Sequence, residues 1–480
     1  MVETTNRLIN MQHILFVLLF CLFSCIDIRA SVVYVSSSVG NDTNTGLEIQ
    51  FPVKTVKNAL GIGDSVMLKS GDVFFESFSL TGKYLSRYGE GPLPKICGYK
   101  RVEKEKWVYV GSNIWKIVLT RDNYSGFTFP ESSMLNNVGG IHDYDVDSIH
   151  GRRVHYKKDL KENWDMWQTE HVSNKETLSS DFDTLYLYLD KDPNILHLEL
   201  SLGTTGVNMK NSTIEQVRIE GFGCHGISAN TCSSIRDCEI DAIGGMTQIG
   251  YQYFVSLGNG IEFYVSNNIE DCLVENCKIS RCYDCGVTIQ AGRCGQATPR
   301  NICVQNNLIY NCCQGWEDFL NNDDNVVYEN CKFQNNVILN SGKTAGFNYP
   351  RRFKYCHVLG NSRKGNKGMI IKNNLFIGGN YYVGGENSSQ FKSNVWINNV
   401  CYIKRGDFIL SNYLGTKDVI RIPKEKGEFK SLKKATDDAV ARYREMTGDK
   451  TTKFVIKSDD YLKRKIERTK HKYENRISKL

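Results

Sequence analysis

Short apolar runs, separated by asparagine-rich corners and by glycines, dominate the chain from about residue 214. Each run has about four to six residues rich in Val, Ile and Phe, and the apolar positions lack the 3.6-residue spacing of a helix. The pattern therefore predicts a succession of short strands.

These strands recur with a regular period. The corners read "DCEI", "NCKI", "NNLI", "NNVI" and "NNLF", and glycine-led runs begin at Gly226, Gly260, Gly286, Gly315 and Gly346. Successive glycines are about 26 to 34 residues apart, which is the length of one supersecondary repeat. Asn tolerates the left-handed backbone of a sharp corner, and stacked Asn side chains can hydrogen-bond along a ladder. We therefore expect an all-β fold in which each repeat forms one coil of a right-handed parallel β-helix.

The start of the repeat region carries a family resemblance. "YVSSSVGNDTNTGLEIQFPVKTVKNAL" (34–60) and "GDSVMLKSGDVFFE" (63–76) resemble the opening of extracellular β-helix proteins of the pectate-lyase-like superfamily, and the resemblance covers about residues 32–410. It implies the chemistry of polysaccharide lyases, glycoside hydrolases or uronate epimerases. The same superfamily contains non-enzymatic adhesins and tail spikes, so the function has to be argued from the site.

The first thirty residues have the pattern of an export signal. An apolar run from Ile14 to Phe23 follows Arg7 and His13 and is too short to span a bilayer. "LFSC" resembles a bacterial lipobox, in which Cys25 would be lipidated and would anchor the protein to the outer membrane or cell surface. Cleavage after Ala30 would instead release a soluble protein. Both alternatives predict an exported protein that is periplasmic, attached to the cell surface or secreted. Separately, we expect the protein to be a monomer.

Three segments follow this signal. The β-helix is expected over 31–416, with a β-rich insertion at about 99–205, where alternating strands are predicted at 113–119 and 184–190. Residues 417–480 are expected to form two helices that begin at Ser431 and Ser458 and close the end of the solenoid. This tail carries about nine net positive charges while the whole chain carries +7, so the β-helix is near neutral. The tail lacks interleaved aromatic residues, and we expect no nucleic-acid partner.

The chain has 17 cysteines, two of them inside the signal, and the remaining odd number is scattered through strand-like runs. This distribution favours structural thiols over a disulfide framework. Cys282 and Cys285 form a CxxC pair without a second pair or histidines at zinc spacing, so a metal site is not indicated.

Alternation along the glycine-led strands identifies candidate catalytic residues. The side chains two positions after each glycine should share the outer face, and this column reads Ser228, Glu262, Thr288, Glu317 and Asn348. Glu262 and Glu317 would lie two coils apart, with backbones about 10 Å apart, which suits the carboxyl pair of an inverting glycosidase. "GWEDF" also resembles the Gly-aromatic-Glu strands of β-helix glycosidase-like proteins. Asp318 is a third catalytic candidate, either at a bulge or buried and hydrogen-bonded.

Other residues are candidates for substrate binding. Tyr264 and Gln290 occupy the position four after the glycine, and Asn348 and Trp316 belong to the glycine-led runs. Lys343, Arg351, Arg352 and His357 form a basic group in "SGKTAGFNYPRRFKYCHV", where a uronate polymer would be held. The family resemblance implies that Arg351 is a substrate ligand. His142 and Trp164 in the insertion could reach over the cleft or serve in packing.

These candidates favour hydrolysis of a complex polysaccharide. The alternatives are β-elimination on a uronate polymer, with Lys343, Arg351 or His357 removing the proton, and non-catalytic glycan binding. Asp323 and Asp324 could bind Ca²⁺ or form a polar turn, and no other cofactor is indicated.

Overall fold

The computed structural model describes most of the chain beyond the first thirty residues. The described ranges are 31–102, 106–120, 126–128, 130, 134–146, 151–170, 179–249, 257–264, 268–291, 298–320, 327–342, 356–360, 368–379, 381–385, 392, 394–412 and 419–477. No helix within these ranges has both the length and the apolar character needed to cross a membrane.

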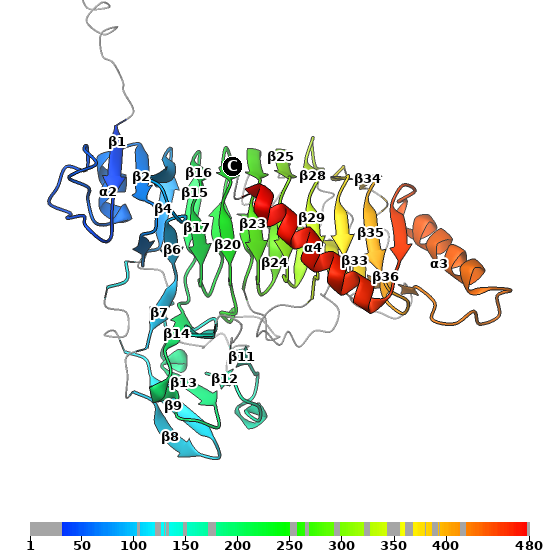
Figure 1. The fold of residues 1–480 in the computed structure, drawn as a ribbon, viewed down its shortest axis with the longest axis horizontal. Helices are drawn as coiled ribbons and strands as arrows, with labels where there is room; N and C mark the ends of the chain where they lie inside the picture. Colours follow the sequence, from blue (N-terminus) through cyan, green and yellow to red (C-terminus); the bar gives the residue numbers. More distant parts are fainter. Residues whose placement is uncertain are drawn as a thin grey trace, which may run out of the picture.

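Three ten-stranded sheets run along one long axis (Figure 1). Within each sheet, consecutive coils contribute neighbouring strands that pair in parallel, and only β36 and β37 pair antiparallel. This arrangement confirms the parallel β-helix expected from the repeats.

The strands of the three sheets, in spatial order, have the following bounds. Sheet 1 contains β1 (Val32–Val35), β2 (Ser65–Lys69), β5 (Tyr84–Tyr88), β16 (Thr213–Glu215), β19 (Ser234–Arg236), β22 (Glu270–Glu275), β25 (Arg300–Gln305), β28 (Lys332–Gln334), β31 (Ile370–Lys372) and β34 (Val395–Ile397). Sheet 2 contains β37 (Ile420–Arg421), β36 (Phe408–Asn412), β33 (Tyr381–Gly385), β30 (Cys356–Gly360), β27 (Gln314–Leu320), β24 (Cys285–Ala291), β21 (Ile261–Tyr264), β18 (Ile227–Ala229), β15 (Val207–Lys210) and β4 (Phe78–Thr81). Sheet 3 contains β3 (Val73–Phe74), β6 (Lys95–Cys97), β17 (Arg218–Glu220), β20 (Glu239–Asp241), β23 (Lys278–Ser280), β26 (Leu308–Tyr310), β29 (Val337–Leu339), β32 (Leu375–Ile377), β35 (Val400–Ile403) and β38 (Lys453–Ile456).

Asparagines form the corner between sheets 1 and 3, as the repeats predicted. Asn276, Asn306, Asn335 and Asn373 have φ between 55° and 59°, the left-handed region that Asn tolerates. The next residue in each of the later coils is a buried asparagine, and these four side chains form a ladder from Asn307 through Asn336 and Asn374 to Asn399. Each ladder side chain bonds the backbone of neighbouring coils as well as the next amide, so the corner has its buried polar groups paired.

The coil interior is one continuous hydrophobic core that extends from Val33 to Tyr443. The described cysteines are all free, and most of them lie in or beside this core. Cys282 and Cys285 are fully buried, and burial raises the pKa of both thiols well above that of an exposed cysteine. The structural role predicted for these thiols is confirmed.

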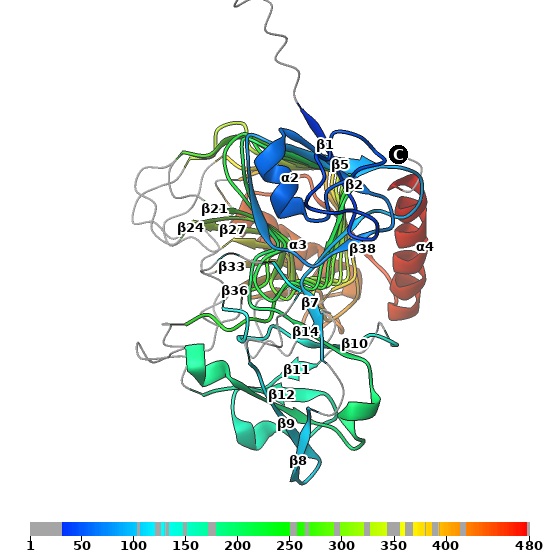
Figure 2. The same cartoon turned by 90° about the vertical axis from the view of Figure 1, so that its left-hand side faces the viewer.

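The inserted segment projects sideways from the N-terminal third of the solenoid (Figures 1 and 2). Its strands are β7 (Tyr99–Arg101), β10 (Ile141–Asp143) and β14 (Leu198–Ser201) in one sheet, and β8 (Val108–Gly111), β9 (Ile114–Val118), β11 (Arg152–Arg153), β12 (Asp165–Trp167) and β13 (Thr184–Tyr188) in another. Three short 3₁₀ helices, η2 (Lys157–Asp159), η4 (Ser179–Phe182) and η5 (Pro193–Ile195), connect them. A separate hydrophobic cluster holds the insertion together, which confirms the predicted β-rich insertion.

Helices close the two ends of the solenoid. At the N-terminal end α2 (Val56–Ile62) packs on β1 and β2, and the Thr55 side chain caps it by accepting the backbone N–H of Asn58. At the other end α3 (Leu432–Thr447) places Ala439 and Tyr443 in the main core.

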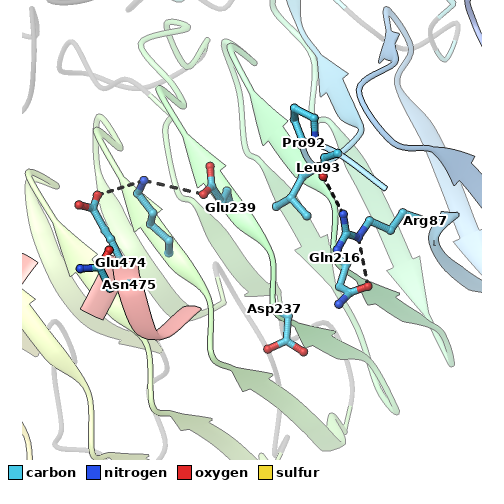
Figure 3. Close-up of a pocket in the computed structure, with 10 residues that line it drawn as sticks. Arg87, Pro92, Leu93, Gln216, Asp237, Glu239, Glu474 and Asn475 are labelled. Atoms are coloured by element: carbon cyan, nitrogen blue, oxygen red, sulfur yellow. Dashed lines mark hydrogen bonds and ion pairs between the residues drawn. The ribbon is translucent and has the colours of Figure 1, made fainter. Parts of the chain in front are cut away.

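The last helix, α4 (Asp459–Ile477), does not cap the end as expected. It lies along the outer face of sheet 3, where Leu462 and Ile466 join a hydrophobic cluster on β26, β29 and β32 (Figure 1). Near the C-terminal end of α4, Glu474 forms an ion pair of 3.1 Å with Lys278 of β23, and Lys278 is also 3.8 Å from Glu239. These residues line a pocket of about 440 Å³ (Figure 3). The apolar stripe of α4 therefore covers the side of the solenoid, because outward apolar residues on sheet 3 need a partner.

Candidate active site

A polar row crosses sheet 2 perpendicular to its strands. Strand register places the following side chains next to one another, from the N-terminal end: Ser79, Asn208, Ser228, Glu262, Thr288 and Glu317. The row predicted from the glycine-led strands is thus correct as far as Glu317. The next position belongs to Leu359 rather than Asn348, because the pairing strand is β30, which begins at Cys356.

Two glutamates of this row are buried with one strand between them. Glu262 is 5% exposed and Glu317 is 2% exposed. Ser228 donates a hydrogen bond to Glu262 at 3.4 Å, and Thr288, on the intervening strand, donates one to Glu317 at 3.3 Å. Two strand spacings separate the backbones by about 9.6 Å. Their burial excludes the simple interpretation of acids on a solvated sheet face.

A histidine that the sequence reasoning missed lies beside Glu262. His225 directly precedes the glycine of β18, and its Nε2 is 3.5 Å from Glu262 Oε2. Its Nδ1 accepts the backbone N–H of Asn259 at 3.2 Å, which leaves the ring proton on Nε2. A proton donor therefore faces Glu262.

The charge of this histidine is under two opposing influences. Burial by itself would lower the pKa of His225, but Cys224 and Glu262 outweigh it and raise this pKa to about 10. Full protonation would cost the hydrogen bond from Asn259, because Nδ1 could then no longer accept it. Both protonation states keep the proton on Nε2, so the contact with Glu262 holds in either.

Amide side chains continue the site next to the acid pair. Asn259 donates to Gln290 Oε1 at 3.3 Å and accepts the backbone N–H of Cys285 at the same distance. Gln314 is fully buried, and both polar atoms of its side chain lack a hydrogen-bond partner within the described part of the chain. A buried amide of this kind usually binds ordered water or a ligand group.

A groove of about 310 Å³ lies on sheet 2 and includes Ser228, the hydrogen-bond partner of Glu262. Its lining includes Ser79, Asn208, Lys210, Ser228 and Tyr264. Tyr264 is 42% exposed, which leaves part of its ring available to a ligand. The groove offers hydroxyl, amide, ammonium and aromatic groups in one line.

Two candidates on β27 belong elsewhere. Trp316 is 1% exposed and lies in the main core, with its ring centroid 4.9 Å from that of Phe333, so its assignment to substrate binding is wrong. Asp318 pairs with Ile289 without a register shift, which rules out a bulge and leaves the buried alternative. Its side chain leaves the strand on the face opposite to Glu317, so it does not complete the acid row.

Histidine 357 is also part of the interior. His357 is 1% exposed, its Nδ1 accepts from Ser341 at 2.9 Å, and its Nε2 donates to the Gly378 carbonyl at 2.5 Å. Burial lowers the pKa of His357 to about 4. The proposed role of His357 as the proton-removing base of a lyase is wrong, because its ring nitrogens are both engaged inside the fold.

The insertion does not bring its two candidates to the acid pair. His142 lies near β6 and β17 of sheet 3, on a different face of the solenoid from Glu262. Trp164 packs against the hydrophobic cluster of the insertion. Of the two alternatives, packing is therefore supported for Trp164, and neither residue is placed over the acid pair.

Several candidates lie outside the described residues, namely Cys25, Asp323, Asp324, Lys343, Asn348, Arg351 and Arg352. Among the residues that are described, no group of three or more His, Cys, Asp or Glu side chains is arranged to hold a metal ion.

Comparison with known proteins adds the following. No family model matches the chain, and no curated protein is significantly similar to it. Among solved structures, the chain is similar to XylC in complex with xylose (13% identity, TM-score 0.44, covering 79% of this chain and 69% of XylC). It is also similar to the GH136 lacto-N-biosidase from Eubacterium ramulus (12% identity, TM-score 0.37, 79% and 65%). A third is the tailspike gp49 of Acinetobacter baumannii bacteriophage Fri1, a capsular polysaccharide depolymerase (12% identity, TM-score 0.29, 81% and 60%). The strand register of the chain itself establishes that it is a parallel β-helix protein.

Proposed function

We propose that this protein hydrolyses glycosidic bonds of a polysaccharide with Glu262 and Glu317. One observation carries the proposal: two buried glutamates occupy the same row of sheet 2, separated by one strand, and a polar groove lies on the preceding strands of this sheet. Burying a carboxyl group is costly, so two acids buried in one row of a sheet are candidates for a specific role.

The spacing of the pair suits an inverting mechanism. Inverting enzymes hold their carboxyl groups about 6.5 to 9.5 Å apart, which leaves room for a water molecule between the base and the sugar. Backbones about 9.6 Å apart allow the side chains to reach this range. Thr288 is the residue of the intervening strand that lies between them.

The neighbours of the two glutamates suggest their roles. Glu262 faces the Nε2 proton of His225, which suits a carboxylate that acts as base. Glu317 accepts from the neutral hydroxyl of Thr288 and would supply the proton. The water between them loses a proton to Glu262 as its oxygen attacks the anomeric carbon, while the proton of Glu317 passes to the leaving glycosidic oxygen.

The groove would bind the chain of sugars that extends from the cleaved bond. Asn208, Ser228 and Lys210 can hydrogen-bond to sugar hydroxyl groups, and the exposed ring of Tyr264 can stack on the apolar face of a sugar. These contacts would position the substrate, while the identity of the sugar would be set by residues nearer the acids, such as Gln290.

The test measures cleavage of a panel of neutral and uronate-containing polysaccharides. We expect new reducing ends without the ultraviolet absorbance of an unsaturated sugar. Glu317→Gln and Glu262→Gln should each lower kcat by about 10²- to 10⁴-fold, as loss of an acid or base does. Glu270→Gln, which changes an exposed glutamate on sheet 1, is the matched control and should leave kcat unchanged.

Two results would contradict the proposal. Reducing ends that rise together with the ultraviolet absorbance would show β-elimination. Saturable binding of a polymer without any loss of its length would show a glycan-binding protein.

A further inference from the structure

A second pocket lies where the insertion meets sheet 3, on a different face from the acid row. It has a volume of about 690 Å³ and is formed by β3, β6 and β17 of sheet 3 together with β7, β10 and β14 of the insertion. Pockets of about 300 to 1,000 Å³ are typical of small-ligand sites. We propose that this pocket binds a carboxylate-bearing sugar, such as a uronate unit of an acidic polysaccharide.

The floor of the pocket is a rigid network of charges on sheet 3. Lys95 bonds Glu220 at 2.7 Å, and Arg218 bonds Glu220 at 2.5 Å, Glu239 at 3.2 Å and Asp241 at 3.1 Å. Because each of these groups has partners within the network, the floor is fixed before a ligand arrives. It offers both donors and acceptors to sugar hydroxyl groups.

The wall formed by the insertion adds further cations to this network. Lys100 and Arg101 line the wall together with one acid, Glu199, whereas Lys95 and Arg218 belong to the floor and are paired with its acids. Arg101 lies over the ring of Tyr144, with its guanidinium carbon 4.6 Å from the ring centroid. Stacking holds the guanidinium plane in place while its N–H edge stays open, and that edge matches a carboxylate with two parallel hydrogen bonds. No ion pair joins Arg101 to an acid in the described part of the chain.

Aromatic groups at the rim indicate a sugar rather than a simple carboxylic acid. Tyr144 is 56% exposed and Phe75 is 42% exposed, and both line the pocket. Exposed aromatic side chains beside polar groups provide surfaces on which the apolar face of a sugar can pack. His142, on the same wall as Tyr144, has its ring 4.9 Å from that of Tyr99 and its Nδ1 3.2 Å from Glu199.

The inference shares the saccharide class of ligand with the proposed function but does not depend on cleavage. The pocket would bind an acidic branch or a distant part of the polymer, while Glu262 and Glu317 cleave the polymer on sheet 2. The two ideas can therefore fail separately, and the experiment measures binding alone.

The test is calorimetric titration of the full chain with digalacturonate, its methyl ester and acetate. Digalacturonate should bind, and Arg101→Ala should weaken this binding by about tenfold or more, the effect of losing hydrogen bonds to a charged group. Arg101→Lys, which keeps the charge but loses the planar edge, should have an intermediate effect. Glu270→Gln, which changes an exposed glutamate on sheet 1, should bind digalacturonate as the unchanged protein does.

The other ligands separate the sources of affinity. The methyl ester should bind at least tenfold more weakly than the acid, and acetate should not compete at equal concentration. Equal binding of the ester and the acid, undiminished binding by a folded Arg101→Ala variant, or no binding of digalacturonate would each overturn the proposal. Thermal melting confirms that each variant is folded.

Discussion

The asparagine ladder gives a quantitative test of what holds the coils in register. Asn336 is fully buried, and its Oδ1 accepts the backbone N–H and the side-chain N–H of Asn307, both at 3.0 Å. Its Nδ2 donates to the Val304 carbonyl at 2.9 Å and to Asn374 Oδ1 at 3.2 Å. Asn336→Ala removes all four hydrogen bonds and leaves their partners buried.

The size of the effect follows from the groups that lose their partners. A buried donor or acceptor without a partner costs about 1 to 3 kcal/mol. The backbone N–H of Asn307 and the carbonyl of Val304 are the two that cannot turn elsewhere, and the amide cavity adds to their cost. We expect Asn336→Ala to lower the free energy of unfolding by about 3 to 6 kcal/mol.

Urea denaturation followed by circular dichroism measures this difference against a matched control. Asn330 also belongs to a column of asparagines, donates to Asn301 at 2.8 Å and has φ of 54°, but it is exposed. Asn330→Ala should cost only the left-handed backbone strain of about 1 to 2 kcal/mol. If the two variants lose the same stability, water replaces the buried amide without cost, and the ladder is not needed to pair the buried polar groups of the corner.

Three further predictions test other parts of the fold. Burial lowers the pKa of His357 from 6.5 to about 4, so the unfolded chain binds more protons than the folded chain between these pH values. The free energy of unfolding should therefore fall by about 3 kcal/mol as the pH drops from 6.5 to 4. In thermal melts across that pH range, His357→Gln should remove this contribution. Asp241→Asn should lower the free energy of unfolding, measured by urea denaturation, by about 3 to 5 kcal/mol, because Asp241 is the shared partner of Arg281 and Arg218. Burial alone would raise the pKa of Asp241, but the two arginines lower this pKa to about 2. Leu462→Ala should weaken the packing of α4 by about 2 to 5 kcal/mol and expose that helix to limited proteolysis while the sheets keep their circular dichroism signal.

Local backbone preference explains why the coils could be predicted. The left-handed corners favour Asn, although Gln216 and Asp237 occupy the same corner in two earlier coils. Alternation then assigns each neighbouring side chain to a face. These two rules were enough to place Glu262, Thr288 and Glu317 in one row. The same alternation puts Trp316 on the inner face, so its core position could have been predicted. Its place next to Glu317 in the sequence led instead to its assignment to substrate binding.

Positions where one coil departs from the pattern could not be predicted in the same way. The fifth strand of the row was assigned from Gly346, yet β30 begins at Cys356 and has His357 where earlier coils have glycine. His225 had only a weak signal, its place before the glycine of β18. The pocket at the insertion depends on contacts between β7 and β17, which are more than one hundred residues apart, and no local rule encodes such contacts.

The stacking of the coils sets the distance between the two acids of the candidate site, and this distance bears on the reaction mechanism. Side chains of one row can be separated only by whole strand spacings of about 4.8 Å. Acids on adjacent strands would stand near the distance of about 5 to 5.5 Å used by retaining glycosidases, whereas one intervening strand brings them near the inverting distance. Thr288 between Glu262 and Glu317 therefore predicts that the sugar released first has the inverted anomeric configuration, which proton NMR of the fresh product reports. A retained configuration would mean that the two glutamates are not the reacting pair, even if each variant is inactive.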